Sequence, residues 1–267
     1  MIEMYSKELL IPERKSSKGN QLKFERDGIW YKADYLGYEG LAEYVISHLL
    51  AYSSLKEEEF ITYDLEELRY RGTVFRGCRS RDFAGMWQLI TLERLLEQHC
   101  GVGMSRIVYG ISDHTERLHT LTEQVERITG LSFGAYISKI LTIDALFLNE
   151  DRHSHNLAVM MNERREFRLC PIFDNGAGLL SDTTLDYPMN QDPLQLIPAT
   201  KPKTFCETFD EQLDIAESLY GQQIRFHFDY SIIKKVLDEA GIYEKSVRER
   251  VMEIILQQRR KYDYLFK

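Results

Sequence analysis

The sequence is short of the features that mark several large classes of protein. Among its 267 residues are only four cysteines, Cys78, Cys100, Cys170 and Cys206, and no two of them form a CxxC pair. Such spacing indicates neither a structural zinc site nor a redox pair, and a few scattered thiols are typical of the reducing cytosol. We therefore expect a cytoplasmic protein.

Positive charge and long apolar runs are also scarce. Lys and Arg number 34 against 42 Asp and Glu, which gives a net charge of −8 at pH 7. A protein that coats nucleic acid needs a basic face to neutralise phosphates, so direct nucleic-acid binding is not expected. No apolar run approaches the ~18 residues of a membrane helix, and the N-terminus lacks a signal-peptide pattern, so no membrane partner is expected.

What the chain does contain is enough apolar material for a large core. Apolar residues make up 43% of the sequence, and no repeat or flexible linker divides it. The pattern nevertheless changes near residue 80, where short strand-like runs and one helix give way to mainly helical periodicity. We predict an α+β protein with a small β-rich lobe at 1–80 and a larger, mainly helical lobe at 81–267.

Local signals predict the elements of the first lobe. Asp27-Gly28 is a strong two-residue turn signal between the strand-like runs 21–26 and 29–33, so a hairpin is expected there. Apolar spacing over 38–50 predicts a helix, and a strand is expected around 71–77.

In the second lobe, an amphipathic helix is predicted over 86–99. Another follows Asp113, a capping residue, and ends at Gly130. Residues 133–148 are apolar nearly all round, which is typical of a helix in the centre of a domain. Asp144 inside that helix needs a buried partner, for which a backbone N–H or an arginine near the following loop are the candidates.

The polar loop after the apolar helix carries the candidate chemistry. It contains Asp151 and Asn156, and two strand-like runs, 157–161 and 167–173, lead from it to Asp174 in an Asp-x-Gly string. Phosphoryl transfer from ATP requires a carboxylate that orients the attacking hydroxyl and accepts its proton, together with hard oxygen ligands for Mg²⁺. The spacing of Asp151 and Asn156 matches the catalytic loop of protein kinases. We therefore assign Asp151 as the catalytic carboxylate and Asn156 and Asp174 as magnesium ligands.

The first lobe offers the remaining parts of a nucleotide site. Lys32, on the second hairpin strand, is predicted to reach the ATP phosphates and to pair with Glu43 or Glu39 of the next helix. The loop before the hairpin is predicted to lie over the phosphates through its backbone N–H groups. It lacks a GxGxxG string, so it is not diagnostic by itself. Its residues in this role are Ser16, Ser17, Lys18 and Gly19.

These motifs are similar to those of one family. The string Asp151-Arg152-His153-x-x-Asn156, followed by Phe-Asp174-x-Gly, resembles that of HipA-like bacterial serine/threonine kinases and, more distantly, that of phosphoinositide lipid kinases. The resemblance implies a two-lobed protein-kinase-like fold, ATP and Mg²⁺ as cofactors, and transfer to a protein serine or threonine. Further stretches similar to the same family lie at 31–34, 39–47, 77–80 and 180–188.

The resemblance also implies regulation and partners. HipA-like kinases can phosphorylate a serine of their own phosphate loop and so inactivate themselves, which makes self-phosphorylation of Ser16 or Ser17 a hypothesis here. Because the chain reaches this loop by residue 16, we expect a short form without the extra N-terminal subdomain of full-length HipA proteins. A protein substrate, a toxin role and an antitoxin partner are implied, although any contact made through that subdomain is left open.

Some features allow two interpretations. His153 and His155 form an H-x-H pair, which indicates either a metal site or, for His153, packing beneath the catalytic loop beside the nucleotide. The three arginines in 76–81 either bind phosphate or are solvated. The long stretch 183–209 stands where an activation segment or a substrate-binding segment is expected.

Two other functions are alternatives to a protein kinase. The first is a kinase-fold enzyme that acts on a lipid head group, on a small alcohol, or on a protein by nucleotidyl transfer. The absence of a basic membrane-facing patch from the sequence argues against the lipid. The second is a pseudokinase, an interaction module that binds nucleotide without transferring phosphate. The presence of every expected acidic residue argues against the second.

Overall fold

The structure is a computed structural model of the chain, and it describes residues 1–10 and 21–267. The strands are β1 (Ile2–Met4), β2 (Lys23–Arg26), β3 (Ile29–Ala33), β4 (Asp64–Tyr70), β5 (Thr73–Arg81), β6 (Gln88–Thr91), β7 (Ala158–Met161) and β8 (Phe167–Leu169). The helices are α1 (Glu39–Leu50), α2 (Leu92–Cys100), α3 (Met104–Gly110), α4 (His114–Thr129), α5 (Phe133–Phe147), α6 (Pro193–Leu196), α7 (Phe209–Tyr220), α8 (Tyr230–Glu239) and α9 (Lys245–Lys261), with short 3₁₀ turns η1 (Glu57–Glu59), η2 (Ile197–Ala199) and η3 (Asp263–Phe266). The predicted phosphate loop, with Ser16, Ser17, Lys18 and Gly19, lies outside the described residues.

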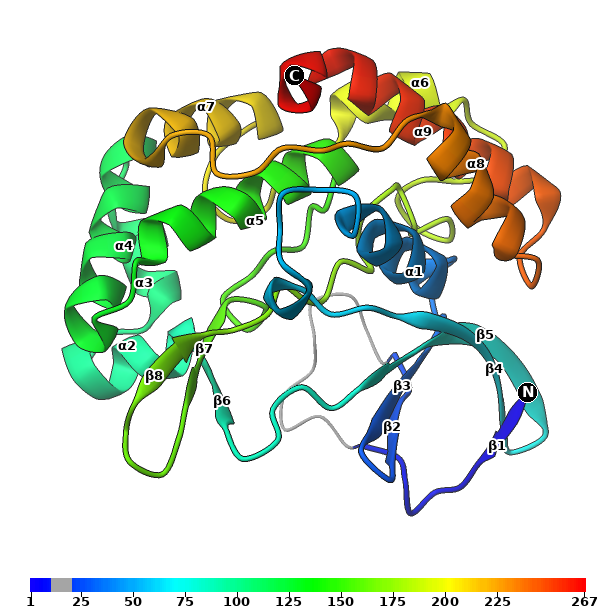
Figure 1. Cartoon of the computed structure of the whole chain (residues 1–267), viewed down its shortest axis with the longest axis horizontal. Helices are drawn as coiled ribbons and strands as arrows, with labels where there is room; N and C mark the ends of the chain where they lie inside the picture. Colours follow the sequence, from blue (N-terminus) through cyan, green and yellow to red (C-terminus); the bar gives the residue numbers. More distant parts are fainter. Residues whose placement is uncertain (11–20) are drawn as a thin grey trace.

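The first part of the chain forms a curved five-stranded sheet in the order β1-β4-β5-β3-β2 (Figure 1). The predicted hairpin is confirmed as β2 and β3, and both turn residues, Asp27 at φ 53° and Gly28 at φ 75°, have the positive φ that a type I′ turn requires. Side chains alternate along β3, so Tyr31 and Ala33 are buried in a small apolar cluster with Phe24. Lys32 therefore points to the opposite face of the sheet.

Helix α1 lies between this sheet and the helical part of the chain (Figure 1). Ten of its twelve residues are buried, which exceeds what a helix covering one sheet face would bury. Its backbone approaches β5 closely, because a Cβ added at Gly40 would lie 2.6 Å from the carbonyl carbon of Gly77. Beyond its C-terminal end, Ser54 N–H donates to the carbonyl of Arg225, and His227 N–H donates to that of Tyr52. The position of α1 is therefore fixed by both parts of the molecule.

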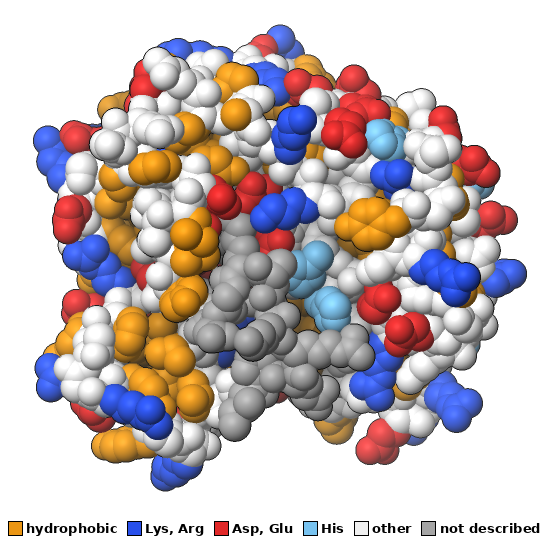
Figure 2. Space-filling model, turned by 180° about the vertical axis from the view of Figure 1, so that it is seen from behind, with side chains coloured by type: hydrophobic (Ala, Val, Ile, Leu, Met, Phe, Trp, Pro, Cys, Tyr) orange, Lys and Arg blue, Asp and Glu red, His pale blue; other side chains and the backbone are white. Residues whose placement is uncertain are grey.

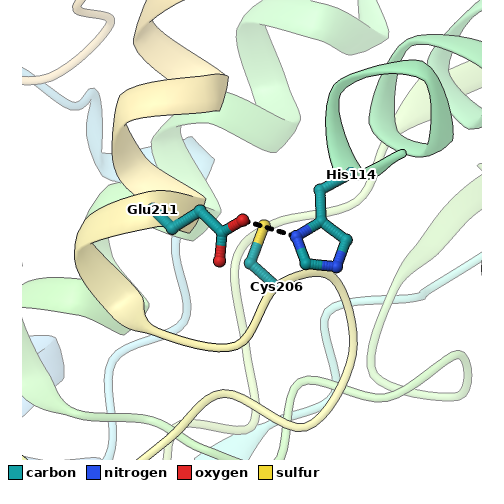
Figure 3. A group of neighbouring side chains, drawn as sticks. All are labelled: His114, Cys206 and Glu211. Carbon is teal, nitrogen blue, oxygen red and sulfur yellow. Dashed lines mark hydrogen bonds and ion pairs between the residues drawn. The ribbon is translucent and has the colours of Figure 1, made fainter. Parts of the chain in front are cut away.

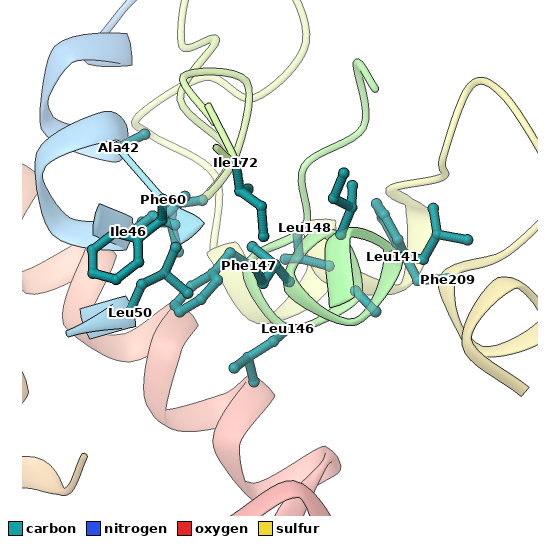
Figure 4. Packing of buried hydrophobic residues seen from close by; sticks show 14 of the residues in the cluster. Ala42, Ile46, Leu50, Phe60, Leu141, Leu146, Phe147, Leu148, Ile172 and Phe209 are labelled. Carbon is teal, nitrogen blue, oxygen red and sulfur yellow. The ribbon is translucent and has the colours of Figure 1, made fainter. Parts of the chain in front are cut away.

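The main core surrounds α5, as the apolar run over 133–148 predicts. Figure 4 shows Phe147 of this helix packed near Ile46 and Leu50 of α1, so one continuous apolar cluster joins the two helices. The helix ends at Leu148, which takes a left-handed conformation at φ 55°. The loop predicted to be catalytic, with Asp151 and Asn156, follows directly and is held by the most buried of the described helices.

The predicted helix that precedes α5 is confirmed at both ends. Asp113 accepts a hydrogen bond from Glu116 N–H at the start of α4, and Gly130 at φ 70° ends it.

Three sequence predictions of secondary structure are corrected. Residues 86–99 were expected to be one helix, but Gln88–Thr91 pair with β7 as strand β6, and α2 begins only at Leu92, where Thr91 accepts from Arg94 N–H as a cap. The strand expected around 71–77 begins after a turn at 71–72 and extends to Arg81. The second strand-like run, 167–173, is regular only over β8. The order β6-β7-β8 forms a three-stranded sheet beside the helices.

None of the helices in the described part of the chain is long and apolar enough to cross a membrane.

Figure 2 shows basic and acidic side chains interspersed on the side of the molecule behind Figure 1. The described part of that face carries no broad basic field of the kind that binds nucleic acid.

Candidate active site

Lys32 of β3 stands between two carboxylates that come from distant parts of the chain. Its Nζ donates to Oε1 of Glu43 on α1 at 2.5 Å and to Oδ1 of Asp174 at 2.7 Å. The ring of Tyr63 lies beneath the same ammonium group, with its centroid 5.2 Å away. The strand, the helix and the Asp-x-Gly segment thus meet at one cation.

The three charges set one another's protonation. Burial lowers the pKa of Lys32, but the charges of Asp174 and Glu43 outweigh this and raise it well above its ordinary value. Burial raises the pKa of Asp174, yet Lys32 and Lys23 bring it well below its usual range. Burial also raises the pKa of Glu43, against the opposing charge of Lys32. Lys32 and Asp174 are therefore both charged at neutral pH.

Glu43, rather than Glu39, is the partner of Lys32. Glu43 is 1% exposed, and its second oxygen accepts from Asn175 N–H at 2.8 Å, so it also holds the segment beside Asp174. Glu39 instead accepts from the backbone N–H groups of Leu36 and Gly37 at the start of α1. The sequence left this choice open, because both carboxylates lie on the same helix and only the packing separates them.

The residues of the predicted catalytic loop form a compact turn after α5. Asn156 Nδ2 donates to the carbonyl oxygen of Asp151 at 3.1 Å, which leaves Oδ1 as the atom that Asn156 can offer to a cation. Asp151 is largely buried, and its Oδ1 lies 3.9 Å from Nζ of Lys203. Its Oδ2 lies 3.8 Å from Nε2 of His153.

His153 contributes to the shape of this turn. Its Nδ1 accepts from His155 N–H at 3.2 Å, and its own backbone N–H donates to the carbonyl of Asp151. Burial lowers its pKa against the opposing effects of Asp151 and Asp174, so the neutral imidazole is favoured. The H-x-H pair is not among the described groups whose ligand atoms converge, and the two rings meet edge to face.

Arg152 supplies the buried partner that Asp144 needs. Its guanidinium reaches both carboxylate oxygens of Asp144, and Asn149 Nδ2 also donates to Oδ1 of this carboxylate at 2.9 Å. The same guanidinium donates to the carbonyl of Phe173 at 2.7 Å and to Oδ1 of Asn175 at 2.6 Å. One side chain therefore joins α5, the catalytic loop and the residues on either side of Asp174. Of the two partners considered from the sequence, the arginine is the one found.

The long stretch after Asp174 returns to the catalytic loop. Lys203 lies 3.4 Å from Glu150 through Nζ, and its backbone N–H donates to the Glu150 carbonyl at 3.0 Å. The hydroxyl of Thr204 donates to the carbonyl of Arg152 at 2.5 Å. Sequence reasoning singled out neither Lys203 nor Thr204, because about fifty residues separate them from the loop and no motif marks them.

The three arginines of 76–81 lie near ion-pair partners or at the surface. Arg76 lies 3.7 Å from Glu244 and over the ring of Tyr243, and Arg79 lies within 4 Å of two carboxylates of β4. These contacts favour the solvated interpretation.

The fold of the chain is similar to that of a solved kinase. No family model and no curated protein matches the sequence. Among solved structures, the proinflammatory kinase CtkA of Helicobacter pylori matches with a TM-score of 0.61 and 14% identity, over 99% of this chain and 95% of that one. The chain has a kinase-like fold. The predicted two-lobed α+β architecture is thereby confirmed, and with it a distant likeness in fold to the expected kinases.

A second match is weaker. HipA of Shewanella oneidensis MR-1, solved in complex with HipB and operator DNA, matches with a TM-score of 0.48 and 10% identity. The alignment covers 95% of this chain and 62% of that chain, so this chain spans less than two thirds of that HipA.

Proposed function

We propose that this chain is an ATP- and magnesium-dependent protein kinase that phosphorylates serine or threonine. The observation that carries the proposal is the position of Lys32, paired with Glu43 of α1 and with Asp174 of the Asp-x-Gly segment. In active kinases a strand lysine pairs with a helix glutamate, and both this pair and the metal-binding Asp must be in place for transfer. The kinase-like fold supports the same interpretation.

The donor set of the site fits Mg²⁺. Asp174 offers a carboxylate of lowered pKa, and Asn156 offers an amide oxygen whose nitrogen is already committed to the Asp151 carbonyl. Both are hard oxygen ligands of the type that Mg²⁺ prefers. Bound there, Mg²⁺ would neutralise charge on the transferred phosphoryl group.

The chain's own residues would act around that ion. Lys32, held by Glu43, would contact the phosphates of ATP. Asp151 would orient the attacking hydroxyl and accept its proton, and Lys203 adds a positive charge 3.9 Å from that carboxylate. Neutral His153 contacts the Asp151 carbonyl and supports the turn that carries these groups.

Incubation with γ-labelled ATP tests this proposal. We expect the wild-type chain to transfer label to its own serines or to added protein in the presence of Mg²⁺, and to lose transfer with EDTA or after Asp174→Ala. Asp214→Ala, which removes an exposed carboxyl of α7, serves as the matched control and should retain transfer. Label recovered only in a lipid or a small alcohol would favour a kinase-fold enzyme that acts on such a substrate. ATP binding without transfer to any acceptor would favour a pseudokinase. Either result would overturn the proposal.

Self-phosphorylation is a separate part of the proposal, and it concerns residues outside the described part of the chain. Mass spectrometry should find phosphate on Ser16 or Ser17 after incubation with ATP. A double Ser16→Ala, Ser17→Ala variant that incorporates as much label as wild type would contradict it.

A toxin role with an antitoxin partner rests on the motif resemblance alone. It would be supported if expression of the wild-type chain arrests growth and expression of the Asp151→Asn variant does not.

A further inference from the structure

A second group of chemically reactive side chains lies in the helical part of the molecule. His114 is the first residue of α4, Glu211 is in the first turn of α7, and Cys206 stands in the segment that leads into α7. One ligand atom from each, an imidazole nitrogen, a thiol sulfur and a carboxylate oxygen, all lie within 4.8 Å of one another. Figure 3 shows the three side chains converging on a common point.

The three donors are of the types that bind zinc. Imidazole nitrogen, thiolate sulfur and carboxylate oxygen are its usual protein ligands, and three of them leave a fourth position for water. Thiolate and imidazole together also disfavour Mg²⁺, which prefers an octahedron of oxygen ligands. From this convergence we propose that His114, Cys206 and Glu211 form a binding site for Zn²⁺.

The geometry requires only small movements of the side chains. His114 Nδ1 and Glu211 Oε1 are hydrogen-bonded at 2.6 Å. Ligand atoms around a tetrahedral Zn²⁺ lie about 3.3–3.8 Å apart, since its bonds are about 2.0–2.3 Å long. On binding Zn²⁺, the imidazole nitrogen and the carboxylate oxygen would therefore move apart by about an ångström. The Cys206 sulfur would be the third protein ligand. On binding, the Cys206 thiol proton leaves to solvent, and neutral His114 carries its remaining proton on Nε2.

The surroundings of the cluster hold two of the ligands in place. The second carboxylate oxygen of Glu211 accepts from Glu207 N–H at 3.1 Å, which orients Oε1 toward His114. Cys206 follows Phe205, whose carbonyl accepts from Nη1 of Arg117 on α4 at 2.6 Å. Hydrogen bonds that orient ligands in this way are typical of metal centres. Burial raises the pKa of the Cys206 thiol to about 12, but a coordinated thiol is deprotonated outright.

The site has a structural consequence for the catalytic loop. Cys206 stands two residues after Thr204, whose hydroxyl donates to the Arg152 carbonyl, and three after Lys203 beside Asp151. Bound Zn²⁺ would fasten the end of this segment to α4 and α7, and so restrain the residues that contact the loop.

Cobalt substitution tests the site directly. The metal-free full chain is titrated with Co²⁺ in an excess of Mg²⁺, and the absorption spectrum is recorded. We expect one equivalent to bind, with the near-ultraviolet charge-transfer band of a cobalt–thiolate bond, and Zn²⁺ to displace it. Cys206→Ser should abolish the band, and His114→Gln or Glu211→Gln should weaken binding by about tenfold or more, as even losses of outer hydrogen-bond partners do.

Matched variants control for the loss of a thiol or an imidazole elsewhere. Cys100→Ser and His119→Gln remove the same groups outside the cluster, and both should keep the band and the affinity. Because Cys206 is buried, His114→Gln and Glu211→Gln at half-buried positions keep the test valid if Cys206→Ser does not fold. Absence of the band in wild type, or its loss in Cys100→Ser with retention in Cys206→Ser, would overturn the proposal. None of these readouts depends on kinase activity.

Discussion

Arg152 and Asp144 form an ion pair that is almost completely buried. The Nε and Nη2 atoms of Arg152 lie 3.0 and 2.8 Å from the two carboxylate oxygens of Asp144, and the side chains are 4% and 0% exposed. Burial raises the pKa of Asp144, against the opposing charge of Arg152. Removal of either partner would therefore leave the other charge buried without compensation.

Removing one partner should destabilise the protein strongly. Arg152→Met leaves the Asp144 charge buried without its cation, and we expect a loss of about 3–5 kcal/mol in the free energy of unfolding. The double variant Arg152→Met, Asp144→Leu should lose less than the sum of the two single variants, because no uncompensated charge is left. Urea denaturation measures all three. A single-variant loss no larger than that of Arg225→Met, which removes an exposed arginine, would contradict this account of the pair.

Close packing at Gly77 should control the distance between Lys32 and Glu43. A Cβ added there would lie 2.0 Å from the backbone oxygen of Lys32, so β3 or β5 must shift. We expect Gly77→Ala to cost about 1–3 kcal/mol of stability by overpacking. We also expect it to lower phosphate transfer, because the shift would disturb the ion pair between Lys32 and Glu43. Gly110→Ala, where an added Cβ meets nothing within 4 Å, is the control. A Gly77→Ala protein with wild-type stability and transfer would show that the contact is not needed.

Lys203 is predicted to act in transfer without being required for ATP binding. Its ammonium lies near Glu150 and Asp151 at the predicted catalytic loop. A positive charge there would stabilise the negative charge that develops on the transferred phosphoryl group. Lys203→Ala should lower kcat by about tenfold, equivalent to about 1.4 kcal/mol, and leave the Kd for ATP unchanged. Lys201→Ala removes an exposed lysine of the same segment and should behave as wild type. Equal effects of the two substitutions would contradict a role specific to Lys203.

The raised pKa of Asp34 should make the stability of the fold depend on pH. Burial raises its pKa to about 7 in the folded state, although hydrogen bonds from Tyr243 Oη and Gly40 N–H oppose the shift. Between pH 4 and 7 the folded state then holds a proton that the unfolded state has released. The Asp34 contribution to the free energy of unfolding therefore falls as pH rises, by at most about 1.4 kcal/mol per pH unit.

Comparison of wild type with Asp34→Asn isolates this effect. The variant has no proton to release at this position, so the difference in unfolding free energy between wild type and variant should fall from pH 4 to pH 7 and stay level above. Asp64→Asn, on an exposed carboxyl of β4, should leave the wild-type slope unchanged. A wild-type and Asp34→Asn difference that is constant across this range would contradict the raised pKa.

Local signals predicted those parts of the fold that local chemistry decides. The Asp27-Gly28 turn, the Asp113 cap and the apolar helix α5 each depend on neighbouring residues, and each is found. Strand β4 was not predicted, because four of its seven residues are charged and its position between β1 and β5 depends on pairing with distant segments. Strand β6 was taken for helix, because only pairing with β7 distinguishes its short apolar run from the first turn of α2.

The candidate site divides in the same way. Asp151, Asn156 and Asp174 are recognisable because the motif spacing reflects a loop, a hairpin and a turn that are close in sequence. The choice of Glu43 over Glu39 depends on how α1 rotates against the sheet. Lys203 reaches Asp151 only through the packing of distant segments, and the same is true of the cluster of His114, Cys206 and Glu211. No spacing in the sequence marks either arrangement.

We propose that Asp151 serves the transfer step in a site that binds Mg²⁺ and ATP through other residues. The most direct test measures ATP affinity and phosphate transfer together in the Asp151→Asn variant. We predict a Kd for ATP equal to that of wild type and a transfer rate lower by about a hundredfold or more, as loss of a general base produces. Transfer at the wild-type rate in Asp151→Asn would contradict the assignment of the catalytic carboxylate.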